Sequence, residues 1–193
     1  MLKGQTVSGL SYDLALTSGL KVDPGSIKIR GGRQKVAKAD ASNPALTGRI
    51  RYSGISGLEL AATAQYQDDI TQQSGDGVES ATLVETHAVW NRGPLGVKAL
   101  FAQWNIDGAV AAAAKKDVQS GYYLEASYKL TPKLGLFARH NTWSNQDGID
   151  KIQQNAGINF WPHENVVIKA DIQQQNDDAG NADGFNLGIG YQF

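Results

Sequence analysis

The sequence predicts an all-β fold, an antiparallel up-and-down barrel of about ten strands that crosses a membrane. Short segments of alternating apolar and polar residues follow one another along the 193 residues, separated by Gly, Asn, Asp and Pro clusters. A period of two indicates strands with one apolar and one polar face. Short turns and long polar loops connect these segments in alternation, as expected when strands run up and down across one membrane.

The last ten residues show the alternation most clearly. One face of the predicted strand carries Phe185, Leu187, Ile189, Tyr191 and Phe193. A strand with lipid on one side and water on the other has this pattern. The segment resembles the C-terminal strand of bacterial outer-membrane barrels, whose terminal Phe is read by the barrel-insertion machinery. The resemblance implies that this machinery is a partner of the chain.

Composition excludes several other classes of protein. Because 18 basic residues balance 19 acidic ones, we expect no nucleic-acid partner. The sequence has no cysteine, which excludes a disulfide scaffold, thiol catalysis and a thiolate metal site. No apolar run approaches the roughly 18 residues of a transmembrane helix, whereas barrel strands need only about 9 to 11 residues and are half polar.

The most basic part of the chain lies between the first predicted strand and the next two. Residues 6–17, 45–53 and 58–67 alternate between apolar and polar side chains. The link from Gly19 to Pro44 separates the first two strands and carries six basic and two acidic residues. A turn at 53–57, rich in Ser and Gly, joins the second strand to the third.

Seven further strands complete the prediction, and each alternates in the same way. They cover residues 84–91, 95–104, 122–129, 134–141, 152–160, 166–173 and 184–193. Pro-containing turns at 92–94, 131–133 and 161–165 alternate with polar loops, and the run Ala111 to Ala114 predicts a short helical turn within one loop. We expect one barrel domain over residues 1–193. Residues 1–5 show no apolar signal region, and we expect the chain to be the C-terminal part of a longer protein.

Aromatic residues recur at the same end of alternate strands. If Phe193 ends on the periplasmic side, every short turn falls on that side as well. The apolar face of each strand that runs toward these turns ends in an aromatic residue, at intervals of 32 to 38 residues: Tyr52, Trp90, Tyr128, Phe160 and Phe193. Rings at one depth form an interfacial girdle, so we predict a membrane girdle from these five residues.

Four stretches carry a more specific resemblance: Gly9 to Leu20, Gly57 to Ala62, Glu85 to Trp90, and Gly184 to Phe193. Together they resemble the C-terminal half of proteobacterial porins similar to the phosphate-selective porin O and P family. The resemblance implies a sixteen-stranded, homotrimeric porin in the outer membrane of a Gram-negative bacterium, in contact with membrane lipid and lipopolysaccharide. It also implies passive transport of small anionic or neutral solutes, with no cofactor and no enzymatic activity.

About ten strands are too few for such a barrel, and two interpretations stay open. The chain is either the C-terminal portion of a larger barrel or a smaller closed one. A small closed barrel would be largely filled by side chains and would have a structural, adhesive or enzymatic role instead of conducting. No catalytic or metal site is predicted, because His87, His140 and His163 lie on different strands or turns without metal-ligand spacing.

Basic residues on the polar strand faces are the candidates for pore lining and anion selectivity. A charge facing lipid at the bilayer midplane would cost about 2–4 kcal/mol, so the lumen is the expected side. The candidates are Arg49, Arg51, Lys98, Arg139 and Lys169. The alternative is neutralisation by carboxylates on neighbouring strands, with Asp13, Glu59, Glu85, Glu125 and Asp171 as partners.

The basic link supplies a second set of candidates: Lys28, Arg30, Arg33 and Lys35. Pro24-Gly25 and Gly31-Gly32 permit sharp reversals of the chain, so we predict that this link folds inward as a constriction. The alternative is a position at the surface, against lipopolysaccharide phosphates.

Overall fold

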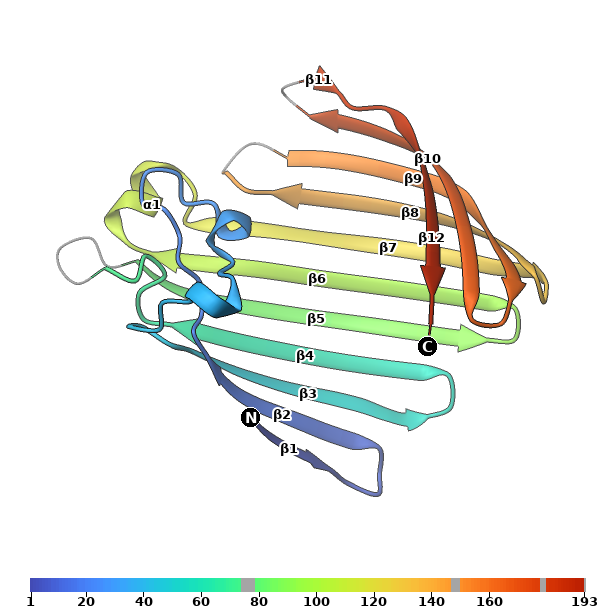
Figure 1. Ribbon diagram of the computed structural model, residues 1–193, viewed down its shortest axis with the longest axis horizontal. Coiled ribbons are helices and arrows are strands. Elements are labelled where there is room, and N and C mark those ends of the chain that lie inside the picture. The colour runs from blue at the N-terminus through green and yellow to red at the C-terminus, as the bar shows by residue number, and fades with distance from the viewer. Residues whose placement is uncertain (74–78, 147–149, 178–179, 193) are drawn as a thin grey trace.

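A single curved antiparallel sheet forms the molecule in the computed structural model, which describes residues 1–73, 79–146, 150–177 and 180–192 (Figure 1). The described strands follow chain order across the sheet, and both β11 and β12 pair with β10. Their bounds are β1 Leu2–Gln5, β2 Leu10–Thr17, β3 Ala45–Ile55, β4 Leu58–Gln67, β5 Ser80–Arg92, β6 Leu95–Asp107, β7 Val118–Thr131, β8 Leu134–Ser144, β9 Asp150–His163, β10 Val166–Asp177, β11 Gly180–Asn181 and β12 Gly184–Tyr191. The predicted all-β, up-and-down fold is confirmed.

Helical structure is confined to connections. A five-residue helix, α1 (Ala109–Ala113), follows β6, in agreement with the helical turn expected there, and two short 3-10 helices, η1 (Ile29–Gly32) and η2 (Val36–Lys38), lie between β2 and β3. Within the described residues, none of the helices has the length and apolar character to span a membrane.

The two ends of the sheet differ in their connections. At one end, two-residue turns lie between paired strands, as between β3 and β4 or β5 and β6. The longer connections gather at the opposite end, together with α1 (Figure 1). We call these the turn end and the loop end. The alternation of short and long connections is therefore confirmed.

The turn between β3 and β4 requires glycine at Gly57. Its φ of +79° lies in the left-handed region, and an added Cβ would collide with the carbonyl oxygen of Asn91. The Asn91 nitrogen also donates to the Gly57 oxygen at 2.7 Å, which ties this turn to the end of β5.

The N-terminal edge differs from the prediction. Residues 6–17 were expected to form one strand, but β2 begins only at Leu10, and Thr6 to Gly9 form a turn from the additional strand β1. The Thr6 nitrogen donates to the Leu10 oxygen at 2.8 Å, and Gly9 has a φ of +82°. Because β1 has four residues, including Lys3 and Gly4, it shows too little alternation to be recognised in the sequence.

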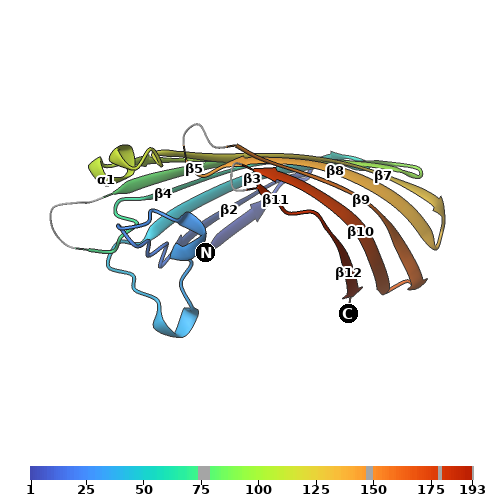
Figure 2. The ribbon, with the colours of Figure 1, turned by 90° about the horizontal axis from the view of Figure 1, so that it is seen from above.

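The sheet curves into a trough. Figure 2 shows that the strands arch together, and that residues 18–44, between β2 and β3, lie on the concave side. We call residues 18–44 the inner segment. Among the described residues, β1 pairs with β2 and not with β12, so the sheet is open in this chain.

The two faces of the sheet differ in chemistry. On the concave face Asp13 lies opposite Arg49, which in turn lies opposite Thr63. The convex face carries exposed apolar side chains, including Leu46, Ile50, Val84, Leu124 and Ile158, each at least 42% exposed. An apolar convex face and a polar concave face are the arrangement of a barrel wall between lipid and water.

A small apolar core lies under the inner segment at the loop end. Its buried members come from the segment and from the elements next to it: Leu20, Val22, Ile27, Ile70, Ala81, Ile106 and Ala111. Ile29 and Trp104 pack partly against it. Ala81 and Ile106 face each other across β5 and β6 on the concave face, so the inner segment is packed onto the inside of the trough.

Candidate functional site

Gln67, at the end of β4, holds the inner segment against the concave face. Its side chain is fully buried. The Gln67 Oε1 atom accepts from the Leu20 nitrogen at 2.7 Å, and Nε2 donates to the Leu20 oxygen at 2.9 Å and the Asn43 oxygen at 3.1 Å. One side chain therefore satisfies backbone groups near both ends of the segment.

Three further side chains fix the path of the segment. The Gln72 Nε2 atom donates to the Ser18 oxygen at 2.9 Å, beside the contacts of Gln67. On β7, Gln119 donates through Nε2 to the Ile27 oxygen at 3.0 Å. Just before β7, Lys116 donates through Nζ to the Ser26 oxygen at 2.8 Å. These contacts attach the middle of the segment to β7, in the middle of the sheet, whereas its two ends are attached to β4, so the segment crosses part of the concave face.

A local network holds the last part of the segment. The Gln34 Oε1 and Nε2 atoms bond the Asp40 nitrogen and oxygen at 2.6 and 2.7 Å. Hydrogen bonds from the Ser42 hydroxyl and then from Lys21, whose Nζ lies 3.0 Å from the Asp40 carboxylate, lower the pKa of Asp40 to about 2. Asp40 is thus charged at neutral pH and bound to the N-terminal half of the same segment.

The four basic candidates of the segment lie in and beside η1, between these anchors. Lys28, Arg30, Arg33 and Lys35 are all exposed. No ion pair joins them to a carboxylate among the described residues; the Nε atom of Arg33 instead donates to the Arg30 oxygen at 3.3 Å. The segment therefore brings four uncompensated cations to the concave side of the sheet.

The five basic candidates on the strands lie on the concave face, and each has a carboxylate nearby. Arg49 contacts Asp13 at 2.6 Å, and Arg51 lies 3.6 Å from Glu59. Lys98 and Arg139 share Glu125, at 3.1 Å from Lys98, and Lys169 lies 3.8 Å from Asp171. Four of these five cations therefore pair across neighbouring strands, as in the alternative considered in the sequence. Lys169 instead pairs with a carboxylate of its own strand, and Glu85 contacts His87.

Aromatic rings accompany some of these cations. The Arg139 guanidinium lies 5.0 Å from the centre of the Tyr123 ring, and the Lys169 ammonium lies 4.1 Å from that of Phe137. Such contacts contribute about 0.5–1 kcal/mol at exposed sites and more where water is excluded. They restrict the side chains to the wall.

The histidines are spread over the sheet. On the concave face His87 bonds through Nδ1 to Glu85 at 2.6 Å, and its Nε2 atom lies 3.5 Å from Glu59. His140 lies beside Thr142, and His163 accepts from the Asn165 nitrogen. Within the described part of the chain, no group of three or more His, Asp or Glu residues has the geometry of a metal site.

The aromatic residues predicted as a girdle lie toward the turn end. Tyr52, Trp90, Tyr128 and Phe160 belong to β3, β5, β7 and β9. Tyr128 and Phe160 are 49% and 42% exposed on the convex face. Phe193, the fifth member, lies outside the described residues.

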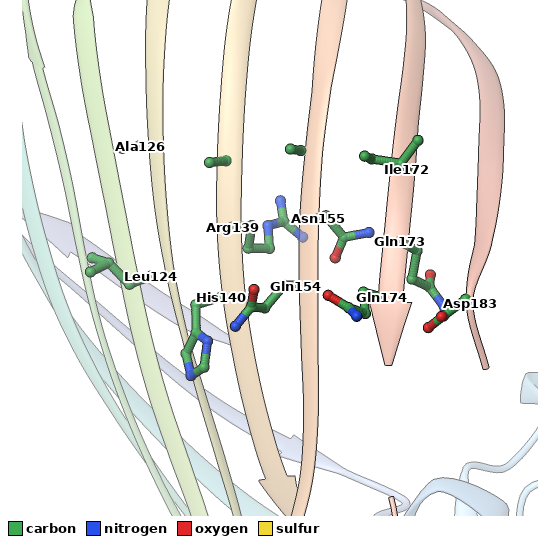
Figure 3. A pocket seen from close by; sticks show the side chains of 12 residues that line it. Leu124, Ala126, Arg139, His140, Gln154, Asn155, Ile172, Gln173, Gln174 and Asp183 are labelled. Carbon is green, nitrogen blue, oxygen red and sulfur yellow. The ribbon is translucent and has the colours of Figure 1, made fainter. Parts of the chain in front are cut away.

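A hollow of about 690 Å³ borders β7 to β10 (Figure 3). Its lining alternates between the two faces of the sheet: Leu124, His140 and Gln154 form one cross-strand row, whereas Arg139 and Asn155 belong to the opposite face. Most of its lining shares the convex face with Leu124, so we regard it as a shallow depression of that face and not as an enclosed site.

Apolar convex strands, a charged concave face and an inward-folded segment together define an outer-membrane porin fold. The sequence matches the family described as phosphate-selective porin O and P over residues 26–193. The chain belongs to this family, whose members are proteins of the Gram-negative outer membrane. No curated protein matches the chain at significant similarity.

Solved structures share the fold. An anion-selective porin from Comamonas acidovorans is 13% identical, with a TM-score of 0.68, over 99% of this chain and 58% of that one. A porin refined at 1.8 Å is 15% identical, with a TM-score of 0.66, over 99% and 60%. A loop L8 deletion mutant of OmpT, an outer membrane protein of Vibrio cholerae, is 11% identical, with a TM-score of 0.56, over 94% and 74%. The chain thus spans about 60% of the first two porins.

The sequence did not reveal what holds the inner segment. Gln67 occupies a polar-face position that matches its expected phase, but nothing in the pattern separates a buried glutamine from one facing water. Gln119 lay in the predicted loop before residues 122–129, whereas β7 begins at Val118. The face of β6 that carries Lys98 continues with Leu100, Ala102, Trp104 and Ile106, and this apolar run is a sequence signal that an apolar layer covers that part of the sheet.

Proposed function

We propose that the protein forms a passive diffusion channel for small hydrophilic solutes, and that the cations of the inner segment give it a preference for anions. The supporting observation is the position of Lys28, Arg30, Arg33 and Lys35 on the concave side without carboxylate partners among the described residues. Unpaired charges at a narrow part of a pore attract ions of opposite sign more strongly than charges that are locally neutralised.

The wall makes a smaller contribution in this proposal. Asp13 balances Arg49, and Glu125 accepts from both Lys98 and Arg139, so only part of the wall's positive charge remains. The fields of two opposite charges this close largely cancel at a distance, and at 0.1 M salt the remainder is screened beyond about 10 Å. The wall cations predicted to line the pore would therefore position solutes more than select them.

The assembly is part of the same proposal. The open sheet and the coverage of about 60% of two solved porins favour a larger barrel, whose remaining strands complete the wall. We propose a homotrimer in contact with outer-membrane lipid and lipopolysaccharide, inserted by the barrel-insertion machinery through the C-terminal strand. We propose a channel and not an enzyme, because the family and the fold are those of porins.

Planar bilayer recording tests this function. The full-length protein is reconstituted, and its reversal potential is measured across a KCl gradient. We expect conductance steps and a reversal potential that indicates preference for chloride. In the quadruple variant Lys28→Gln, Arg30→Gln, Arg33→Gln and Lys35→Gln, the preference should fall toward equal permeability.

A matched variant separates the segment from the wall. Arg49→Gln combined with Asp13→Asn removes one cation and one anion that contact each other at 2.6 Å, so we expect only a small shift of the reversal potential. Absence of conductance in the unmodified protein would contradict the channel. A larger shift from the wall pair than from the quadruple variant would contradict the assignment of selectivity to the segment.

A further inference from the structure

A second hollow, of about 540 Å³, lies between the inner segment and the concave face at β6 and β7. It is distinct from the depression that borders β7 to β10. The segment contributes Ile29, Arg30 and Arg33, and the sheet contributes Ala102, Trp104 and Gly121, among others. Its volume falls in the range of small-molecule sites, about 300–1,000 Å³.

The sheet side of this hollow offers an apolar surface. Ala102 and Gly121 lie opposite each other in the register of β6 and β7, so no large side chain rises between the strands at this level. Trp104 stands two residues farther along β6, on the same face, and is only partly covered by the core. The result is a floor of small residues beside an indole ring.

The segment side offers positive charge. Arg30 and Arg33 are exposed, and neither has an ion pair with a carboxylate among the described residues. Because the Nε atom of Arg33 is already bonded to the Arg30 oxygen, its terminal nitrogens are the donors that remain for a ligand. Two guanidinium groups can bind one carboxylate or phosphate through several N–H donors.

We infer that this hollow is a binding site for a small organic anion, with the anionic group on Arg30 and Arg33 and an apolar body on Trp104 and Ile29. The inference rests on the proposed channel function and specifies its substrate class. Inorganic phosphate and acetate offer the charge but little or no apolar surface, whereas an aromatic carboxylate uses both sides of the hollow. Burying a ring also adds hydrophobic and stacking energy.

The site should be weak, because a solute that passes through a channel must also leave it. We expect a dissociation constant for benzoate in the millimolar range. Acetate should bind at least about tenfold more weakly, since it lacks the ring. Inorganic phosphate should likewise be a poor competitor.

Ligand-detected NMR measures this binding without requiring conductance. Saturation is transferred from the full-length protein in detergent to the ring protons of benzoate, and acetate or inorganic phosphate is then added as a competitor. We expect a benzoate signal that neither competitor removes at equal concentration. Displacement of benzoate by equimolar phosphate would overturn the inference.

Three variants locate the site. Arg30→Gln with Arg33→Gln removes the charge and should weaken benzoate binding about tenfold. Ala102→Leu fills the floor and should weaken it by a similar factor. Lys38→Gln removes an exposed cation of the same segment that does not line the hollow, and binding should be unchanged. Because Arg30 and Arg33 are exposed, their variant should fold even if Ala102→Leu does not.

The outcomes separate this inference from the channel function. A protein that conducts with an anion preference but shows no benzoate signal, or binds it equally in the Arg30→Gln, Arg33→Gln variant, refutes the organic-anion site alone. If benzoate binding changes in the variants as expected but the protein gives no conductance, the channel function is refuted and the organic-anion site is kept.

Discussion

The side-chain oxygen of Gln67 lies 2.7 Å from the backbone nitrogen of Leu20, 47 residues earlier in the chain. This contact joins the end of β4 to the beginning of the inner segment. Together with the bonds from Gln67 Nε2 to the oxygens of Leu20 and Asn43, it keeps the segment on the concave face. One buried amide therefore attaches both ends of the segment to β4, in addition to the contacts made by Gln72, Gln119 and Lys116.

Replacing Gln67 should release the segment. Gln67→Ala leaves the Leu20 nitrogen without its hydrogen-bond partner and removes a buried side chain, so we expect a loss of about 2–4 kcal/mol in the free energy of unfolding. Limited proteolysis of the reconstituted protein should then cleave within residues 18–44. Gln65→Ala is the matched control, because Gln65 is only partly buried and, among the described residues, its side chain bonds only to Thr47. Equal protease resistance of both variants would show that Gln67 is not the anchor.

Neutralising Glu125 should increase the preference for anions. Its side chain is 9% exposed and accepts from Lys98 and Arg139, so Glu125→Gln leaves two wall cations without their carboxylate. We expect a more positive pore and a loss of about 2 kcal/mol in unfolding free energy, less than for a fully buried pair because both cations are partly exposed.

Reversal potentials of three proteins check this point. Glu125→Gln should shift the reversal potential toward anions, and adding Lys98→Gln should restore it, because the double variant has the net charge of the unmodified wall. An unchanged potential in the single variant would mean that solutes do not sense this part of the wall.

The inner segment should withstand acid down to about pH 3. The pKa of Asp40 is lowered from 3.8 to about 2 in the folded protein, chiefly by Ser42 and then by Lys21. A carboxylate with a lowered pKa stabilises the folded state fully above its unfolded value, and this contribution is lost as pH falls through the folded value. Cleavage of the segment by pepsin should therefore stay slow from pH 4 to 3 and accelerate toward pH 2.

Ser42→Ala provides the control for Asp40. Removing the main hydrogen bond should move the onset of cleavage upward, toward the ordinary pKa of an aspartate. An onset that stays near pH 2 in this variant would attribute the acid response to other groups.

Two turn glycines should differ in their tolerance of a side chain. Gly57→Ala forces alanine into a left-handed conformation and against the Asn91 oxygen, so we expect a loss of about 2–3 kcal/mol. Gly93 also has a positive φ, of +58°, but no atom lies within 4 Å of an added Cβ. Gly93→Ala should cost about 1 kcal/mol. Urea unfolding in lipid vesicles measures both, and equal losses would exclude the collision at Gly57.

Period-two alternation identified the long strands and the side on which each connection falls, because burial of one face fixes the phase of every residue along a strand. For that reason Arg49 and Glu125 were assigned to the polar face correctly. The strand β1 was missed because four residues carry too little pattern. The path of the inner segment was anticipated from its glycines, but its anchors were not, since Gln67 and Gln119 act on residues 47 and 92 positions away.

Charge compensation on the wall was only one of two interpretations of the sequence. Pairing of Arg139 with Glu125 depends on the register between β7 and β8, which an alternating pattern restricts to every second residue but does not determine. The structure supplies the register, and with it the contrast between paired wall cations and unpaired segment cations.

The most direct test of the account is a charged label at Arg33 during current recording. The sequence has no cysteine, so Arg33→Cys introduces a single reactive thiol. An anionic methanethiosulfonate added to the open channel should react, lower the conductance and reduce the preference for anions, while a cationic reagent should restore that preference. Current and reversal potential that stay unchanged after confirmed labelling would contradict the position of the inner segment in the conducting path.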